Sequence, residues 1–115
     1  MLISCQINLL GYNNDMEKST PHCKLSIVKD LIKSDKVRAT MSAFNGARQL
    51  GINDLAGMCD IILKLRAADF YKSMTTHKDH HIWQDVYRAK TANGSNVYLK
   101  LTVIDDVLIV SFKEL

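Results

Sequence analysis

Two alternating runs of apolar and polar residues lie near the end of the chain, and they constrain its fold more than any other feature. They span residues 96–104 and 107–114 and are separated by Asp105-Asp106. Both runs are rich in β-branched and aromatic residues, as is typical of half-buried strands. Two aspartates between such runs indicate a two-residue turn. The sequence therefore predicts an antiparallel hairpin.

Counting outward from the Asp105-Asp106 turn predicts the register of this hairpin. The expected pairs are Ile104 with Val107, Thr102 with Ile109, Lys100 with Ser111, and Tyr98 with Lys113. Side chains alternate between the two faces of a sheet, so one face of the hairpin is apolar. Its expected members are Val97, Leu99, Leu101, Val103, Leu108, Val110 and Phe112. The opposite face is expected to carry Tyr98, Lys100, Ser111 and Lys113.

The pairing of Tyr98 with Lys113 is chemically informative. Cross-strand partners have Cβ atoms about 5 Å apart, and at that separation a phenol and an ammonium can exchange protons and hold a phosphate. Lys72 and Arg88, from neighbouring strand candidates, are expected on the same face. Such a cluster suits an RNA backbone, because cations neutralise phosphate and the charge that develops on a reacting phosphorus. The same pattern is also typical of a solvated sheet face that has no catalytic role.

Helical periodicity precedes these strands. A helix is expected over residues 25–35, with an apolar face made of Leu25, Val28, Leu31 and Ile32. Thr40 or Ser42 is expected to cap a second helix that stops at Gly51, and Asn53 a third. The period then changes to two, which predicts strands over 70–76 and 82–88. This order predicts an α+β fold, with the N-terminal helices packed on one face of an antiparallel sheet of about four strands.

The turn at Asn93-Gly94 leaves one ambiguity in this sheet. A two-residue loop would place Arg88 opposite Leu99 and turn Gln84 toward the core. A longer loop or a bulge would turn Gln84 toward the face that carries Tyr98. The residues alone leave both arrangements open.

Composition limits the domain organisation and the partners. The 115 residues are 47% apolar, which fits one domain with a packed core. The net charge of +3 is compatible with nucleic acid without requiring it. No apolar run is long enough to span a bilayer, and three cysteines without C-x-x-C spacing fit a reducing compartment. We interpret residues 1–15 as a flexible extension, or alternatively an added strand, and residues 16–115 as the domain.

His77, Asp79, His80 and His81 are the residue types that bind metals, but they fall in a predicted loop. No second group of ligands follows at metal-site spacing, so we expect no metal. No carboxylate cluster suggests a two-metal nuclease, and no glycine-rich loop suggests a nucleotide cofactor. Phosphodiester chemistry is therefore expected to be metal-independent and cofactor-free. That favours RNA over DNA, because RNA supplies its own 2′-hydroxyl nucleophile.

Four stretches are specific enough to suggest a family. They are DFYKSMTT at 69–76, IWQDVYR at 82–88, VYLKLTVI at 97–104 and DVLIVSFKE at 106–114. Shorter ones are Glu17-Lys18, Thr20-Pro21-His22 and Gly57-Met58-Cys59. All of these resemble the MqsR toxins, the motility quorum-sensing regulator toxins of type II toxin–antitoxin pairs. The resemblance runs from Met16 onward and is nearly verbatim over the strands.

This resemblance implies a RelE-like bacterial RNase fold and an mRNA interferase. Such an endoribonuclease cuts single-stranded mRNA, with preference for GCU sites, independently of the ribosome. The implied protein partner is an MqsA-type antitoxin, a zinc-containing DNA-binding protein, so DNA would be contacted only through the antitoxin. We therefore expect a cytoplasmic toxin without a membrane partner, which cleaves by in-line attack of the ribose 2′-oxygen on the adjacent phosphorus.

The family's proposed catalytic residues fall on Lys72, Gln84, Tyr98 and Lys113 of this chain. Tyr98 and Lys113 are the pair that the hairpin register predicts, and the family favours Gln84 on their face. Further substrate contacts are expected from Arg88, Met74, His80 and Lys100. Trp83 is a candidate for stacking on a base as well as for the core.

The chain departs from the family pattern in three places. It has Ile104-Asp105-Asp106-Val107 where the pattern reads Ile-His-Asp-Val, His77 replaces a tyrosine, and the loop at 89–96 is one residue longer. We expect these changes to affect sequence preference more than cleavage itself. The alternative to an enzyme is a catalytically silent RNA- or antitoxin-binding protein on the same scaffold.

Overall fold

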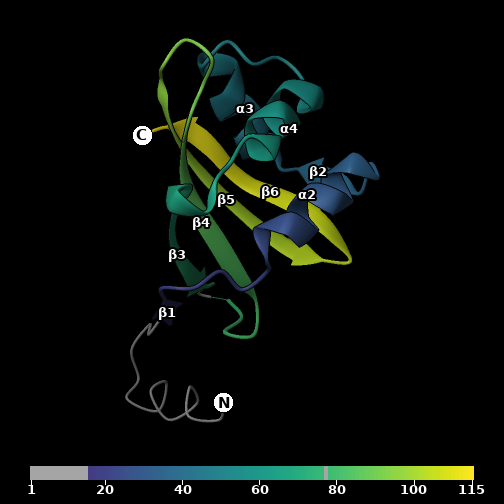
Figure 1. Ribbon diagram of the computed structural model, residues 1–115, viewed down its shortest axis with the longest axis vertical. Coiled ribbons are helices and arrows are strands. Elements are labelled where there is room, and N and C mark those ends of the chain that lie inside the picture. Colours follow the sequence, from purple (N-terminus) through teal and green to yellow (C-terminus); the bar gives the residue numbers. More distant parts are fainter. Residues whose placement is uncertain (1–15, 77) are drawn as a thin grey trace.

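The protein is built around a six-stranded sheet in this computed structural model, which describes residues 16–76 and 78–115. Its strands are β1 (Glu17–Lys18), β2 (Val37–Ala39), β3 (Phe70–Thr75), β4 (Trp83–Lys90), β5 (Asn96–Ile104) and β6 (Asp106–Glu114). The helices are α2 (Leu25–Lys33), α3 (Met41–Gln49) and α4 (Leu55–Leu63), with a 3-10 turn η1 (Ala67–Asp69). The α+β class is as predicted (Figure 1). The predictions for residues 1–15 lie outside the described residues.

The sheet has more strands than the sequence predicted. The strand order is β1-β3-β4-β5-β6-β2, in which β2 runs parallel to β6 and the other neighbours are antiparallel. β1 has two residues and β2 has three. Segments this short contain no alternation that a period-two pattern can detect, so both edge strands were missed.

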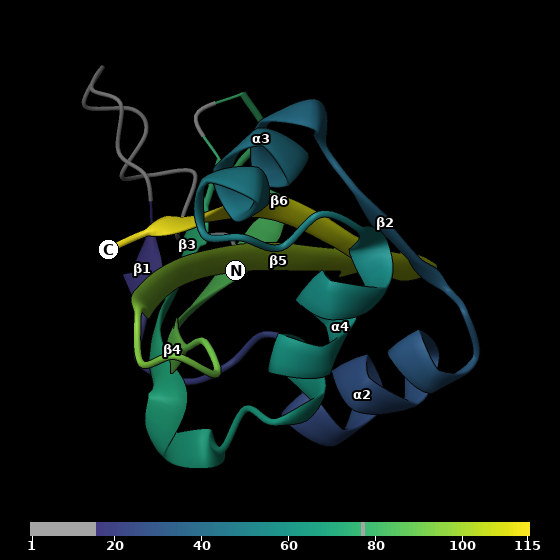
Figure 2. The same cartoon turned by 90° about the horizontal axis from the view of Figure 1, so that it is seen from above.

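The core lies between the helices and one face of the sheet. Its fully buried residues include Val28 of α2, Ala43 and Ala47 of α3, Met58 and Ile62 of α4, and Tyr87, Leu99, Leu101 and Phe112 of the central strands. α2 and α4 contact each other, and α3 lies next to β6 (Figure 2). Each of these helices has nine residues, and no helix in the described part of the chain is long and apolar enough to cross a membrane.

α3 packs along the edge of β6 that β2 leaves open. β2 pairs with β6 only as far as Ile109. Just beyond, the Thr40 hydroxyl donates to the carbonyl of Val110 and also accepts from the backbone N–H of Ala43, which caps α3. A Cβ atom on Gly46 would overlap the carbonyl oxygen of Phe112. Glycine is therefore required where the helix backbone meets the strand.

Helix ends follow the predicted chemistry with two corrections. α2 stops at Lys33, two residues before the predicted end, because Asp35 adopts a φ of 62° in the left-handed region that ends helices. α4 is capped by Asp54 and not by Asn53, since the Asp54 carboxylate accepts the backbone N–H of Gly57 at 2.8 Å. Adjacent Asn and Asp are both good caps, so the pattern could not distinguish them.

The predicted register of the closing hairpin is confirmed far from the turn and is wrong near the turn. Asp105, with a φ of 67°, forms the turn alone, so Ile104 pairs with Asp106 and Thr102 with Leu108. A bulge opposite the step from Lys100 to Leu101 makes Val110 the extra residue and restores the predicted pairs Lys100–Ser111 and Tyr98–Lys113.

This bulge also changes which residues of β6 enter the core. Val107 and Ile109 are fully buried, whereas the predicted core residues Leu108 and Val110 are only half-buried. A one-residue shift moves every side chain to the other face. The predicted pairs Ile104–Val107 and Thr102–Ile109 are therefore wrong.

The loop between β4 and β5 settles the orientation of Gln84. Lys90 pairs with Asn96, so residues 91–95 form the loop, and Gly94 adopts a φ of 89° within it. Arg88 consequently pairs with Tyr98. Gln84 is four residues before Arg88 on the same strand, so it shares the face that carries Tyr98. The longer-loop alternative is the one the structure adopts.

Candidate active site

Tyr98 lies beside Lys113 on the sheet face that points away from the core. The two residues are direct cross-strand partners, and their neighbours Leu99 and Phe112 point into the core. The Lys113 Nζ lies 5.3 Å from the centre of the Tyr98 ring, and the Lys100 Nζ lies 5.9 Å from it. Two ammonium groups therefore lie within 6 Å of the centre of the Tyr98 ring.

A bulge in β3 brings two consecutive residues to this outer face. Phe70 pairs with Tyr87 and contacts it in the core, whereas Lys72 pairs with Val86. Tyr71 is the extra residue between these pairs. Its ring lies against the Arg88 guanidinium, whose Cζ is 3.8 Å from the ring centre. The bulge therefore places Tyr71 and Lys72 together, beside β4.

We use the name basic face for the outer surface of β3 to β6. Its residues are Tyr71, Lys72, Met74, Gln84, Val86, Arg88, Tyr98, Lys100, Ser111 and Lys113. Val86 is fully buried at its centre and is paired with Lys72 on one side and Lys100 on the other. Long cationic side chains often cover apolar surface with their methylene stems while the charge stays in water. The centre of the basic face is therefore apolar, and cationic side chains lie around it.

Lys72 is held by a carboxylate from the edge strand. Its Nζ lies 2.7 Å from Oε2 of Glu17, which is half exposed. The hydrogen bond to Glu17 raises the pKa of Lys72 above its ordinary value, and the nearby Tyr71 and Tyr98 act in the same direction. Like-charged neighbours would lower the pKa of a lysine, and at Lys72 the shift is in the opposite direction. Lys72 is therefore a firmly protonated cation.

Gln84 and Met74 lie on the basic face but at a distance from Tyr98. They are cross-strand partners, and Glu17 pairs with Met74 on the other side. Gln84 is four residues from Arg88 along β4, which corresponds to about 13 Å. It is a diagonal neighbour of Lys72 instead, at about 7–8 Å. Gln84 can therefore contact a nucleotide held near Lys72 and not the group held by Tyr98.

His80 belongs to the loop between β3 and β4 and is half-buried there. In the same loop Asp79 accepts hydrogen bonds from the backbone and ring of His81, and these bonds lower the pKa of Asp79. Among residues 16–76 and 78–115 no three His, Cys, Asp or Glu side chains are grouped so that they could hold a metal ion.

Trp83 lies on the side of β4 opposite the basic face. It alternates with Gln84, and its ring stacks on His22 with centres 5.7 Å apart. The Lys18 Nζ lies 4.2 Å from the Trp83 ring centre. The nearby Asp85 carboxylate accepts the backbone N–H groups of His22 and Cys23. Trp83 therefore packs against the segment that contains β1 and His22. Because it points away from the basic face, it cannot stack on a base bound there.

Glu17 and Tyr71 are the residues of this site that sequence reasoning missed. Glu17 is distant in sequence from Lys72, and β1 is too short to be predicted. Tyr71 would face away from Lys72 in a regular strand, and only the bulge brings it to the same face. The single available signal was the shared DFYK motif, which does not indicate a bulge.

Comparison with known proteins identifies the family of the chain. The family described as motility quorum-sensing regulator, toxin of MqsA, matches residues 20–114. The mRNA interferase toxin MqsR of Escherichia coli (strain K12) is 60% identical over 99 residues, which cover 86% of this chain and 99% of that protein. The family match includes every residue of the basic face.

Proposed function

The chain belongs to the family of motility quorum-sensing regulator toxins, and from that premise we propose that it is an mRNA interferase whose basic face cleaves single-stranded RNA. The observation that carries this proposal is the Tyr98–Lys113 pair, surrounded by Lys72, Arg88 and Lys100. This arrangement provides a proton-transferring phenol among cations that attract a phosphate. A silent RNA binder would need the cations but not the phenol between them.

The proposed reaction uses the substrate's own nucleophile. The ribose 2′-oxygen loses its proton and attacks the adjacent phosphorus in line, while the bond from phosphorus to the 5′-oxygen breaks. The 5′-oxygen takes up a proton, so the products are a 2′,3′-cyclic phosphate and a 5′-hydroxyl. Tyr98 and Lys113 carry these two proton transfers between them. Lys72 and Arg88 stabilise the negative charge that develops on the phosphorane.

The remaining residues of the basic face have positioning roles in this proposal. Gln84 and Met74 contact the nucleotide next to the cleaved bond, on the Lys72 side. Lys100 lies across Val86 from Lys72 and contacts the RNA backbone, while His80 contacts RNA from the loop. These roles follow from the positions along β3 to β5.

The biological setting is part of the same proposal. We infer a RelE-like toxin unit over residues 16–115, a GCU preference that does not depend on the ribosome, and a cytoplasmic location where mRNA is found. The family's description as a toxin of MqsA supports an MqsA-type antitoxin as the protein partner. DNA would then be contacted through the antitoxin only.

The proposed mechanism predicts that chelators do not abolish cleavage. The groups that carry the proposed reaction are the phenol of Tyr98, the ammonium groups of Lys113 and Lys72 and the guanidinium of Arg88, and these are poor ligands for divalent metals. Purified toxin treated with excess EDTA should cut a defined single-stranded mRNA at rates within about two-fold of the untreated enzyme. Strict dependence on added Mg²⁺ or Zn²⁺, measured on the same RNA, would contradict the proposal.

Glu17→Gln is expected to strengthen RNA binding, because Lys72 must exchange the Glu17 carboxylate for an RNA phosphate. An exposed ion pair of this kind contributes up to about 1 kcal/mol, so KM should fall by up to about five-fold. Without Glu17 the pKa of Lys72 falls toward its ordinary value. The loss of activity at alkaline pH should then begin at a lower pH than in the wild type.

Asp30→Asn is the matched control for this experiment. Asp30 is exposed on α2, and its replacement changes the net charge by the same amount. Steady-state kinetics across an alkaline pH series compare the two variants. If Glu17→Gln behaves like Asp30→Asn in both KM and pH profile, Lys72 does not contact the phosphate.

A further inference from the structure

A cationic groove begins where the basic face ends. β3 starts at Phe70, which pairs with Tyr87, whereas β4 continues to Lys90. β4 therefore extends three residues beyond its pairing with β3. A cavity of about 420 Å³ lies beside this extension, and its lining includes Lys64, Arg66, Asp69, Arg88 and Lys90.

The side chains of this groove favour a polyanion. Lys64 follows α4 and Arg66 precedes η1, while Arg88 and Lys90 alternate with Ala89 and so share one face of β4. Asp69 is the acidic side chain of the lining, and it is bonded to Arg66 at 3.1 Å. Among the side chains of the lining, Lys64, Arg88 and Lys90 are therefore three cations in excess of this pair, and Leu115, the last residue of the sequence, also lines the groove. A ligand with several negative charges would complement them.

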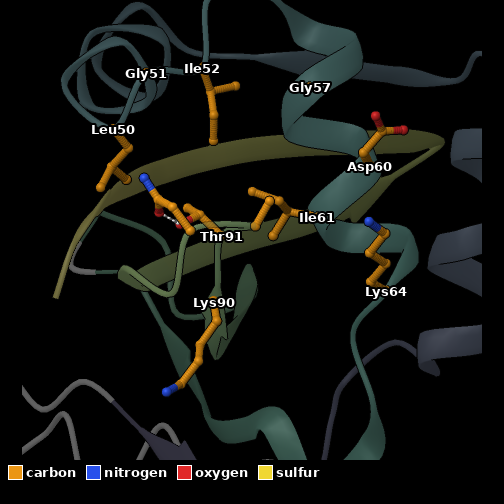
Figure 3. A pocket seen from close by; sticks show the side chains of 11 residues that line it. Leu50, Gly51, Ile52, Gly57, Asp60, Ile61, Lys64, Lys90 and Thr91 are labelled. Carbon is orange, nitrogen blue, oxygen red and sulfur yellow. Dashed lines mark hydrogen bonds between the residues drawn. The ribbon is translucent and has the colours of Figure 1, made fainter.

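A second hollow adjoins the groove and has an apolar wall. Its volume is about 440 Å³, and it shares Lys64 and Lys90 with the groove. Leu50 and Ile52, after α3, and Ile61 of α4 project into it (Figure 3). Asp60 of α4 is the acidic side chain of this hollow. A ligand bound by the two lysines would thus have an apolar surface next to its charges. Phosphates joined to flat bases have this combination of properties.

Arg88 connects the groove to the basic face. It lines the groove and is also the cross-strand partner of Tyr98. Lys90 follows two residues later on the same side of β4, at about 7 Å. Cations that continue at such intervals form a track along which a single-stranded backbone can run.

From this continuity we propose that the groove binds the RNA that flanks the cleaved bond, with Lys64 and Lys90 on its phosphates and a base against Ile61. The proposal rests on the proposed function of the basic face. It adds a second binding site, which determines the length of RNA that the toxin contacts. The bond-breaking residues are unchanged by it, so the groove contributes to binding of longer RNA and not to the chemical step.

The test uses the full-length double variant Lys64→Gln/Lys90→Gln, which leaves the Arg66–Asp69 pair intact. Lys33→Gln/Lys36→Gln is the control, because it removes the same charge from two exposed lysines, one at the end of α2 and one just after the turn that follows. Two RNAs share one central sequence. The short RNA covers only the cleaved step and its immediate neighbours, and the long RNA extends it on both sides. For binding, both are made uncleavable by 2′-deoxy substitution at the cleaved nucleotide.

The groove variant is expected to bind the long RNA about ten-fold more weakly than the wild type at low salt. Its slope of log affinity against log salt should decrease by about 1.4, which corresponds to two lost phosphate contacts on a single strand. Binding of the short RNA and kcat on its cleavable form should not change. The control variant should match the wild type on both RNAs.

Two results would overturn the proposal. One is a groove variant that binds the long RNA with wild-type affinity and salt slope. The other is an equal loss on short and long RNA, which would indicate a general charge effect. If the variant instead loses only binding to an acidic protein such as an antitoxin, the groove is a protein-docking site and the RNA proposal is wrong. A wild type that binds the long RNA through the groove but cuts neither RNA would support the groove and refute the proposed function.

Discussion

Tyr98→Phe is expected to slow RNA cleavage about ten-fold or more while leaving the fold intact. The substitution removes the phenolic hydroxyl and keeps the ring, so the contacts of the ring with Lys100 and Lys113 are retained. What is lost is the group that transfers a proton. The decrease should therefore appear in kcat, with KM changed little, when initial rates are measured on a defined RNA under saturating conditions.

Tyr87→Phe is the matched control, because Tyr87 lies on the opposite face of the same sheet. Its hydroxyl is buried in the core and has no hydrogen-bond partner among the described residues. Burial raises the pKa of the Tyr87 phenol, which therefore stays protonated. Removing an unsatisfied buried hydroxyl should keep activity at the wild-type level and raise the free energy of unfolding by about 1 kcal/mol.

The two tyrosine variants together separate chemistry from folding. Thermal unfolding should show that both variants are folded. If Tyr98→Phe cleaves at the wild-type rate, Tyr98 does not transfer a proton. If Tyr87→Phe loses activity to the same extent, the effect of losing a tyrosine hydroxyl is not specific to the basic face.

The central part of the site could be predicted from the sequence because its geometry is local. Hairpin pairing follows from alternation and from the position of the turn, and the pair Tyr98–Lys113 was identified in this way. The prediction succeeded although the turn has one residue and not two. The bulge at Val110 compensates for the shorter turn. Bulges of this kind leave no pattern in a single sequence, so the core positions of Val107 and Ile109 were missed.

The rest of the site depends on contacts between distant segments. Glu17 reaches Lys72 from an edge strand of two residues, and the orientation of Tyr71 depends on a bulge in β3. Gly46 is a residue with no evident role in the sequence, yet α3 could not pack against β6 with any side chain there. These features result from how the elements pack, and periodicity carries no information about them.

The central claim is that the basic face promotes attack by the substrate's own 2′-hydroxyl. The most direct test is a chimeric RNA that carries one 2′-deoxynucleotide immediately before the bond that the toxin cuts in the all-ribose RNA. Without that hydroxyl no nucleophile adjoins the phosphorus, so cleavage there should fall to the uncatalysed level. The fall should amount to at least about 10⁶-fold in a typical enzyme.

The products of both RNAs are mapped at nucleotide resolution after incubation with purified toxin. We predict 2′,3′-cyclic phosphate and 5′-hydroxyl ends from the all-ribose RNA, and no cut at the deoxy position of the chimera, while any other target bond in it is still cleaved. Cleavage at the deoxy position at a comparable rate, or products with 5′-phosphate ends, would contradict the account.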